Sequence, residues 1–448
     1  MAVKKNSSEI TVGAVGLGYV GQPFVGAMAE AGFNVVGLDI DQNLINKLSE
    51  DYEPTVYEPG LKEIFKVHQA NISFTSNYEV MMQKSDAIFL SVGTPLNSKG
   101  EPDSKSIEAC VSEIAPRVKN GQLIILRSTV VPGTTRWLAD QIQKRTGLQP
   151  GTDFFVAFSP ERTVSGNAVQ ELKTLPAIVG GMDVESTKRS VHIMKLLSKS
   201  IVITTSSPEI AEVAKLVDNM YRTLNIGFAN ELGLIAEGAG IDAYEVVSAV
   251  NKSYERTSVF RPALGAEGPC LSKDPLILRH FAQTKGVETK ILDAVVDVNK
   301  NATDRIALEI IGFIEKHKIN NPIISLLGLA FKGSPETDDV RGSPAIAVIE
   351  AIQNYFDSTK VTFQLFDPIV TNFQGLNTEI NVDDSIRDAN IVVVMNDHKL
   401  LRNIPIGHIT QISKRPLLVI DAWHSIKGLD SFEKSENIEV FRVGDGQK

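Results

Sequence analysis

The chain has 448 residues, more than one hydrophobic core usually supports, so two or three domains are expected. It is 43% hydrophobic and 22% charged with no apolar run long enough to cross a membrane, and its net charge of −9 argues against a general nucleic-acid binder. Two cysteines cannot form a disulfide framework, and the polar start over residues 1–8 has no apolar signal core, so a soluble cytoplasmic protein is expected.

The first elements of the chain predict a dinucleotide site. An apolar run over 10–15 predicts a buried strand, and G-L-G-Y-V-G at 16–21 then opens a helix. Gly16 permits the tight turn, Gly18 lets a pyrophosphate approach the backbone, and Gly21 lets helix and strand pack closely. The phosphates would then meet the unpaired N–H groups at the helix N-terminus.

A second strand over 33–38 ends at Asp39, about 20 residues after the glycine turn. This carboxylate suits a ribose 2′-hydroxyl and would repel a 2′-phosphate, so NAD is favoured over NADP. The alternative is a glycine turn that holds no ligand.

Further strands are predicted over 86–92, 122–127 and 154–158, which makes a parallel doubly wound sheet the expected architecture. Ligands in such sheets bind beyond the carboxyl ends of the strands. Several polar residues fall there and together line one rim, although each could be a turn residue with no other role: Thr94, Pro95, Thr129 and Glu161.

Apolar residues at helical spacing predict one long helix over 208–237, a spine between domains that could also offer a dimer surface. Lys215 and Asn219 lie four residues apart and therefore on one face of this helix. A lysine and an amide aimed at one site can hold an oxygen on which negative charge develops. The alternative is two polar residues on a solvated face.

The segment R-P-A-L-G-A-E-G-P-C-L-S-K-D-P carries Cys270, and its glycines, among them Gly268, allow close approach. Asp274 is predicted to cap a helix that starts at the next residue. The helix N-terminus and the ammonium of Lys273 would favour thiolate, the reactive form of Cys270. The alternative is a small buried cysteine, with Asp274 acting only as a cap.

The last third of the chain predicts a second small α/β sheet. A strand over 322–329 leads into A-F-K-G, and Ser343 starts a helix; later strands are predicted over 361–366, 391–395 and 417–420. This sheet lacks G-x-G-x-x-G, so a different ligand is expected. Lys332 and Arg341 suit phosphate or hydroxyl groups, unless they are only exposed surface charges.

Seven motifs in this order resemble the UDP-sugar 6-dehydrogenase family, and the resemblance runs nearly end to end. They are G-L-G-Y-V-G, S-V-G-T-P, R-S-T-V-V-P-G, S-P-E-R-T-V-S-G-N, E-V-A-K-L-V-D-N, G-P-C-L-S-K-D-P and G-L-A-F-K-G-S-P-E-T-D-D-V-R-G-S-P. The resemblance implies an NAD-dependent, four-electron oxidation of a sugar primary alcohol to a carboxylate, in polysaccharide biosynthesis. Two NAD are consumed, and Cys270 holds the intermediate as thiohemiacetal and thioester.

The resemblance also implies roles for single residues. Lys215 and Asn219 would stabilise the oxyanion, Asp274 with Thr129 would position or deprotonate water, and Glu161 would assist proton transfer or hydrolysis. The cofactor residues implied are Gly16, Gly18, Tyr19, Val20, Gly21, Asp39, Thr94, Thr129 and Arg341. The substrate residues implied are Glu161, Arg162, Lys215, Asn219, Arg256, Phe331 and Lys332. No metal site is predicted.

The expected fold class is α/β, with two Rossmann-like doubly wound domains joined by the long central helix and a small helical middle domain. The predicted boundaries are 1–206 for the NAD-binding domain, 207–315 for the central helical domain with the cysteine and the dimer surface, and 316–448 for a UDP-binding domain. Arg256 matches an arginine that in relatives reaches the sugar of a neighbouring subunit, so a homodimer or higher homo-oligomer is expected.

The motif S-P-E-R followed by G-N resembles the branch that oxidises UDP-N-acetylhexosamines. UDP-N-acetylmannosamine is favoured, with UDP-N-acetylglucosamine and UDP-glucose as alternatives. The segment Glu267-Gly268-Pro269 departs from the family's glycine-glycine-histidine before the cysteine, in a loop that faces the sugar in relatives.

Two rival functions remain open from the sequence. A two-electron hydroxyacid dehydrogenase would share the dinucleotide fold and the Lys-x-x-x-Asn helix, but it needs neither Cys270 nor a second nucleotide domain. A non-catalytic NAD sensor that pairs through the long helix would not need the four residues Lys215, Asn219, Cys270 and Asp274. No nucleic-acid or membrane partner is expected.

Overall fold

The computed structural model describes residues 6–356, 360–429, 432 and 437–446. The chain forms two compact units, each built on its own sheet. The first contains Met1–Asp218 and Leu276–Glu288, and the second contains Asn219–Pro275 and Thr289–Lys448. Within the described ranges, no helix is both long enough and apolar enough to span a bilayer.

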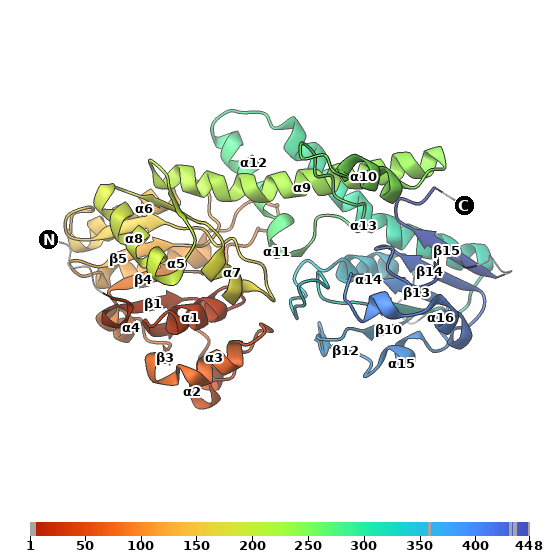
Figure 1. The fold of residues 1–448 in the computed structure, drawn as a ribbon, viewed down its shortest axis with the longest axis horizontal. Helices are drawn as coiled ribbons and strands as arrows, with labels where there is room; N and C mark the ends of the chain where they lie inside the picture. The colour runs from red at the N-terminus through yellow and green to blue at the C-terminus, as the bar shows by residue number, and fades with distance from the viewer. Residues whose placement is uncertain (1–5, 357–359, 430–431, 433–436, 447–448) are drawn as a thin grey trace. The chain divides into compact units, whose positions relative to one another are not determined.

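The first unit is organised by an eight-stranded sheet in the order β3-β2-β1-β4-β5-β6-β7-β8 (Figure 1). All neighbouring strands are parallel except β6 and β7, which run antiparallel. The expected parallel doubly wound sheet is therefore confirmed for its five predicted strands β1, β2, β4, β5 and β6, which run parallel to one another, whereas β3, β7 and β8 were not predicted. The strands are β1 Thr11–Val15, β2 Asn34–Leu38, β3 Ile72–Thr75, β4 Ala87–Leu90, β5 Leu123–Leu126, β6 Phe155–Phe158, β7 Ala177–Gly181 and β8 Val202–Thr204.

Helices cover both faces of this sheet because its strands are apolar on both sides. In β4, Ala87 and Phe89 join a core with α1, α2, α3, α7 and α8, while Ile88 and Leu90 join a second core with α4, α5 and α6. The helices are α1 Gly21–Glu30, α2 Gln42–Asp51, α3 Leu61–Val67, α4 Tyr78–Lys84, α5 Lys105–Ile114, α6 Thr134–Thr146, α7 Ala168–Thr174 and α8 Val184–Leu197. Three short 3₁₀ turns accompany them: η1 Ser7–Glu9, η2 Gln69–Asn71 and η3 Ala115–Arg117.

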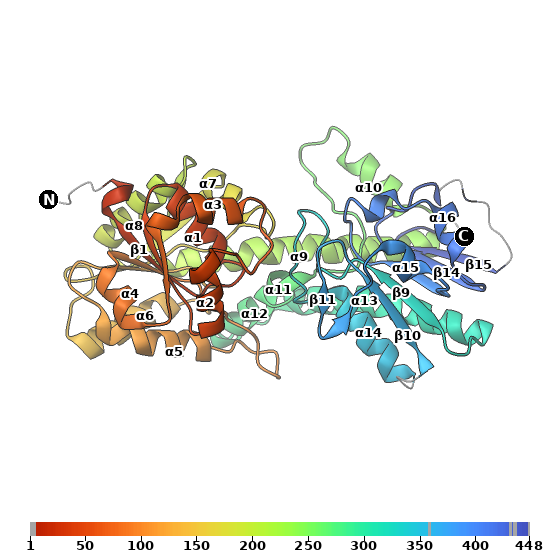
Figure 2. The same cartoon turned by 90° about the horizontal axis from the view of Figure 1, so that it is seen from below.

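The long helix predicted over 208–237 is α9, which runs without a break from Pro208 to Ala239 (Figure 2). Its 32 residues span about 48 Å at 1.5 Å per residue. A second long helix, α13, was not predicted; its Arg305 forms an ion pair with Glu237 of α9. The other helices of this part of the chain are α10 Ala243–Asn251, α11 Gly268–Leu271 and α12 Asp274–Thr284, followed by α13 Lys290–His317.

The second unit contains a five-stranded parallel sheet in the order β10-β9-β13-β14-β15. As predicted, Ser343 caps the first helix of this sheet, accepting the N–H of Ala345 at 3.2 Å. The strands are β9 Ile323–Leu327, β10 Thr362–Phe366, β13 Ile391–Val394, β14 Leu417–Asp421 and β15 Ile438–Arg442, with a small hairpin of β11 Asn372–Phe373 and β12 Leu376–Asn377. The helices are α14 Pro344–Tyr355, α15 Val382–Ile386 and α16 Ile406–Ile412, with the 3₁₀ turn η5 Leu401–Asn403.

Candidate functional site

The three glycines of the first turn each meet a different steric demand. Gly16 has φ +88°, and a Cβ there would lie 2.8 Å from the carbonyl oxygen of Ser91. A Cβ on Gly21 would lie 1.8 Å from the carbonyl oxygen of Gly16, so the turn and α1 can pack only around a glycine. Gly18 is exposed with nothing within 4 Å of a Cβ, which leaves its backbone open to a ligand. This arrangement fits a pyrophosphate held at the start of α1.

Asp39 lies directly after β2 and is joined to the glycine turn. Its Oδ2 accepts the N–H of Leu17 at 2.7 Å, and its Oδ1 accepts the N–H of Asp41 at 3.1 Å. The carboxylate is therefore held beside the turn, where it can still accept a hydroxyl hydrogen bond. Tyr19 and Val20 are half-buried in the same turn.

The polar residues predicted along the rim come directly after β4, β5 and β6. Thr94 donates its hydroxyl to the backbone oxygen of Thr129 at 2.6 Å, so these two predicted residues lie together. Because parallel strands end at one edge, Glu161 after β6 lies at the same edge as Gly16 and Asp39.

Glu161 is held by a cation that the sequence analysis did not single out. Arg127, at the end of β5, donates to Glu161 in an ion pair whose side chains are only 2% and 14% exposed. The other oxygen of Glu161 accepts the N–H groups of Arg162 at 2.7 Å and Thr163 at 2.6 Å. Burial favours the neutral acid, but Arg127 and these donors outweigh it and lower the pKa of Glu161.

Arg162, predicted to contact substrate, is engaged within its own unit. Its Nε lies 3.4 Å from Oδ2 of Asp218 on α9, and its Nη1 lies 3.5 Å from the backbone oxygen of Pro176. The S-P-E-R loop is thereby tied to the central helix.

Lys215 and Asn219 both lie on the buried face of α9, with exposed fractions of 7% and 2%. Asn219 donates Nδ2 to Oδ2 of Asp274 at 2.5 Å. This bond fixes the orientation of the amide and leaves the second N–H of Nδ2 for another acceptor.

Cys270 lies within α11, a single helical turn, and its side chain is exposed. Cys110, the other cysteine, is buried in α5, and burial raises the pKa of its thiol to about 12. Only one of the two thiols is therefore placed to react with a molecule in solution.

The segment after Cys270 differs from the prediction in two respects. Helix α12 begins at Asp274 itself, one residue earlier than predicted, and Asp274 is fully buried. The ammonium of Lys273 lies 2.8 Å from Oδ1 of Asp274, so its charge is paired with this carboxylate and is not directed only at the thiol. Asp274 thus accepts from Asn219 and Lys273, and it links α9 to the cysteine segment.

The cysteine segment packs directly on the loop after β9. A Cβ on Gly268 would lie 2.5 Å from the ring of Phe331, and the N–H of Gly268 donates to the backbone oxygen of Gly342 at 3.1 Å. The predicted substrate residue Phe331 is therefore in close contact with the turn that carries Cys270.

The remaining predicted residues belong to the second unit. Lys332 lies 5.6 Å from the ring centroid of Phe331 and donates Nζ to the backbone oxygen of Pro335 at 2.9 Å. Arg341 makes a two-pronged bond to the buried Asp339, at 2.8 and 2.7 Å, and keeps an exposed side chain. Arg256 is exposed in the segment after α10.

Glu267, part of the unusual segment before the cysteine, is a half-buried acid with one enclosed carboxyl oxygen. Among the described residues its Oε1 has no hydrogen-bond partner, and burial raises its pKa well above the usual value. The neutral acid is therefore favoured three residues before Cys270.

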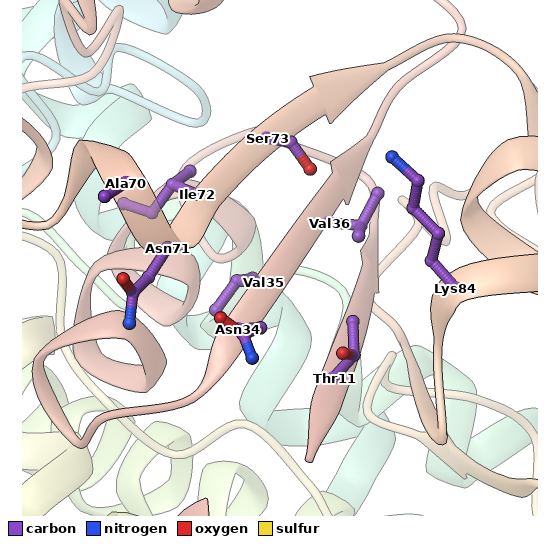
Figure 3. Close-up of a pocket in the computed structure, with 9 residues that line it drawn as sticks. All are labelled: Thr11, Asn34, Val35, Val36, Ala70, Asn71, Ile72, Ser73 and Lys84. Atoms are coloured by element: carbon purple, nitrogen blue, oxygen red, sulfur yellow. The ribbon is translucent and has the colours of Figure 1, made fainter. Parts of the chain in front are cut away.

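A hollow of about 300 Å³ lies at the edge of the first sheet where the strands start, opposite the edge formed by their carboxyl ends (Figure 3). It is lined by residues of the strands β1, β2 and β3, of the turn η2 and of the end of α4: Thr11, Asn34, Val35, Val36, Ala70, Asn71, Ile72, Ser73 and Lys84. The predicted cofactor residues of the first unit lie at the carboxyl ends of the strands, so this hollow is separate from them.

Three models of one protein family match successive parts of the chain. The NAD binding domain of the UDP-glucose/GDP-mannose dehydrogenase family matches residues 10–200, its central domain matches residues 209–301, and its UDP binding domain matches residues 325–428.

Individual relatives agree with this match. UDP-N-acetyl-D-mannosamine dehydrogenase from Pyrococcus horikoshii is 30% identical over 422 residues, covering 93% of this chain and 96% of that protein. NDP-N-acetyl-D-galactosaminuronic acid dehydrogenase from Ralstonia nicotianae is 30% identical over 404 residues, covering 88% and 92%. The solved structure of UDP-D-ManNAc dehydrogenase from P. horikoshii matches with a TM-score of 0.86 at 28% identity, covering 98% of this chain and all of that one.

The resemblance found in the sequence is thus confirmed along nearly the whole chain. The chain belongs to the UDP-glucose/GDP-mannose dehydrogenase family and is an NAD-dependent nucleotide-sugar dehydrogenase.

Proposed function

We propose that this enzyme oxidises the primary alcohol of a UDP-N-acetylhexosamine, with UDP-N-acetyl-D-mannosamine as the favoured substrate, to the corresponding uronic acid. The observation that carries the proposal is the exposed thiol of Cys270 on a turn that is fixed to Asn219 through Asp274 and packed on Phe331. The acetylated amino sugar is supported by the relatives in P. horikoshii and R. nicotianae, which are both named for such sugars, and the choice of N-acetylmannosamine is supported by the P. horikoshii relative.

NAD supplies the hydride acceptor for both oxidations. The residues that would hold it are the turn from Gly16 to Gly21, Asp39 at the ribose, and Thr94 with Thr129 at the rim. The positive φ of Gly16 and the open backbone at Gly18 support this assignment. Arg341 would complete the cofactor site, as the family resemblance implies.

The thiol of Cys270 divides the reaction into two oxidations. The alcohol loses a proton and a hydride and becomes an aldehyde, and the thiolate forms a C–S bond to its carbonyl carbon, which gives a thiohemiacetal. The thiohemiacetal then loses its hydroxyl proton and a second hydride and becomes a thioester. Water adds to the thioester carbon and the C–S bond breaks, so that the carboxylate product forms with release of a proton and the thiol is regenerated, with two NAD reduced per sugar.

The polar residues around this chemistry would stabilise charge and move protons. Asn219 would donate its remaining N–H to the oxyanion formed on the sugar carbon, and Lys215 would supply a positive charge. Asp274 would orient Asn219 and, with Thr129, position or deprotonate the water, while Glu161 would assist proton transfer or hydrolysis.

The UDP group would bind to the second unit. Phe331 offers an apolar face and Lys332 a cation, and Arg162 would contact the sugar part of the substrate. Arg256, which is exposed, would reach the sugar bound to a partner subunit.

A homodimer would form along α9. One face of this helix is buried in its own chain, yet the opposite face presents an apolar stripe at helical spacing whose side chains are 49% to 64% exposed: Ile210, Val217, Tyr221, Phe228 and Ile235. A second copy of this chain is the occupant we propose. Phe228→Glu combined with Tyr221→Glu should give a monomer by light scattering, and an unchanged assembly would contradict this interface.

The reaction is tested by counting NADH released per UDP-sugar consumed, in a panel of UDP-hexoses and UDP-N-acetylhexosamines. Two NADH per sugar, with the highest kcat/KM for UDP-N-acetylmannosamine, is the expected result. One NADH per sugar would identify a two-electron dehydrogenase and remove the thioester route. A preference for UDP-glucose would overturn the substrate assignment and leave the mechanism standing.

A further inference from the structure

The buried ion pair between Arg127 and Glu161 lies at the carboxyl edge of the first sheet. Arg127 comes directly after β5 and Glu161 comes after β6, and these strands are paired in parallel with Leu126 opposite Phe158. The register therefore brings the two loops side by side, and Nη2 of Arg127 donates to Oε2 of Glu161. With 2% of its side chain exposed, Arg127 is too deeply buried to touch a substrate.

The surroundings of Arg127 make Glu161 its charge partner. The guanidinium lies over the ring of Phe24 on α1, 4.7 Å from the ring centroid, and the backbone N–H of Arg127 donates to Leu90 at 2.9 Å. Within the part of the chain that the structure describes, Nε and Nη1 have no hydrogen-bond partner. The guanidinium is therefore bonded through Nη2 to Glu161, and the carboxylate neutralises a buried cation.

Other charged groups near Glu161 are already directed elsewhere. The guanidinium of Arg162 faces Asp218 on α9, and Glu171 on α7 accepts the N–H of Val164 at 2.8 Å. Burial alone would raise the pKa of Glu161, and the charge of Arg127 is the largest contribution that opposes it. Without Arg127, burial would therefore prevail and the carboxyl would hold its proton at a higher pH.

We propose that Arg127 is a positioning residue that keeps Glu161 ionised and oriented, so that Glu161 acts in the reaction as a proton acceptor. This inference rests on the proposed function, in which Glu161 takes part in proton transfer or hydrolysis. Of the two possible roles of Glu161, proton donor and proton acceptor, the ion pair favours the acceptor. A carboxylate already paired with a buried guanidinium has no proton to give at neutral pH.

The test is the pH dependence of kcat/KM, measured as NADH release with UDP-N-acetylmannosamine and NAD. In Arg127→Met the acid limb of the profile should move to higher pH by about 1 to 3 units, with activity recovering at high pH, because the proton acceptor regains its proton more readily. Arg127→Lys keeps a cation at this position and should bring the acid limb most of the way back to its wild-type pH. Arg136→Met removes an exposed arginine paired with Glu209 at 2.8 Å in the same unit, and it should leave the profile unchanged.

An acid limb that stays in place in a folded Arg127→Met protein would overturn the proposal, because a purely structural ion pair would lower activity evenly at every pH. If Arg127→Met does not fold, Glu161→Gln decides: its residual activity should lack the wild-type acid limb, and retention of that limb would reject the proposal. If the wild-type protein oxidises none of the UDP-sugars, the proposed function fails first, and Arg127 loses its role with it.

Discussion

The two sheets begin with the same turn. Gly16 comes directly after β1 with φ +88°, and its N–H donates to the backbone oxygen of Leu38 at 2.8 Å. Gly328 comes directly after β9 with φ +95°, and its N–H donates to Phe366, also at 2.8 Å. In both cases a glycine closes the first strand against the last residue of its neighbour.

An acid at the end of that neighbouring strand anchors each turn. Asp39 accepts the N–H of Leu17 at 2.7 Å, and Asp367 accepts the N–H groups of Leu329 at 2.7 Å and Ala330 at 3.0 Å. The second sheet thus uses the turn of a dinucleotide fold although it lacks the glycine motif.

The two turns differ in the segment that connects each of them to its helix. In the first unit α1 starts at Gly21, so backbone N–H groups at a helix end are available to a phosphate. In the second unit a longer loop with Phe331, Lys332 and Arg341 intervenes before α14, which starts at Pro344. Under the proposed function, a shared turn would therefore serve different ligands, through the backbone in the first unit and through side chains in the second.

The largest effect is expected from the first turn. Gly21→Ala places a Cβ 1.8 Å from the carbonyl oxygen of Gly16, which α1 can relieve only by moving, so we expect a loss of about 3 kcal/mol or more and no measurable NAD binding. Thermal unfolding and calorimetric titration with NAD measure both. Gly18→Ala is the matched control and should keep the wild-type Tm, since nothing lies within 4 Å. A Gly21→Ala protein with unchanged NAD affinity would refute this packing account.

Substitution of the two anchoring acids, Asp39 and Asp367, should weaken the binding of NAD and of UDP separately. Asp39→Ala removes the acceptor for Leu17 and for the ribose, and we expect about tenfold weaker NAD binding with UDP binding unchanged. Asp367→Ala should weaken UDP binding and leave NAD binding unchanged. Each variant is the control for the other in titrations with NAD and with UDP. If either variant weakened the binding of NAD and of UDP equally, the idea that the two turns serve different ligands would be wrong.

A smaller effect is expected at Glu267, beside the loop that the second turn supports. The pKa of this acid is raised in the folded protein, so between its usual value and the raised value the unfolded chain binds fewer protons than the folded one. Stability should therefore fall as pH rises through this interval. Glu267→Gln removes the titration and should stabilise the protein by about 1 kcal/mol at neutral pH relative to wild type, measured by denaturant unfolding at several pH values. A wild-type pH dependence in this variant would show that Glu267 is not the group responsible.

The parts of the molecule that depend on local spacing can be predicted from the sequence. The glycine turn, Asp39 after the second strand and the period of α9 can be read from neighbouring residues, and the structure has all of these elements. Cys270 is exposed, so the alternative of a small buried cysteine is wrong, while its catalytic role stays a prediction.

The parts that were missed depend on contacts between distant segments. The pairing of Arg127 with Glu161 arises from the register of β5 against β6, although R-S-T and S-P-E-R were both noted. The strand β7, Ala177–Gly181, was not predicted, and its antiparallel direction depends on its pairing with β6. The ammonium of Lys273 was assigned to the thiol because its contact with the buried Asp274 was not apparent from the sequence.

The central claim is that one thiol carries the substrate between two oxidations. The most direct test supplies limiting UDP-N-acetylmannosamine with excess NAD and counts NADH for wild type, Cys270→Ser and the control Cys110→Ser, whose thiol is buried in α5. Two NADH per sugar are predicted for wild type and Cys110→Ser, with one or fewer for Cys270→Ser, because a hydroxyl is a poorer nucleophile. Two NADH per sugar at the wild-type rate from Cys270→Ser would contradict the account.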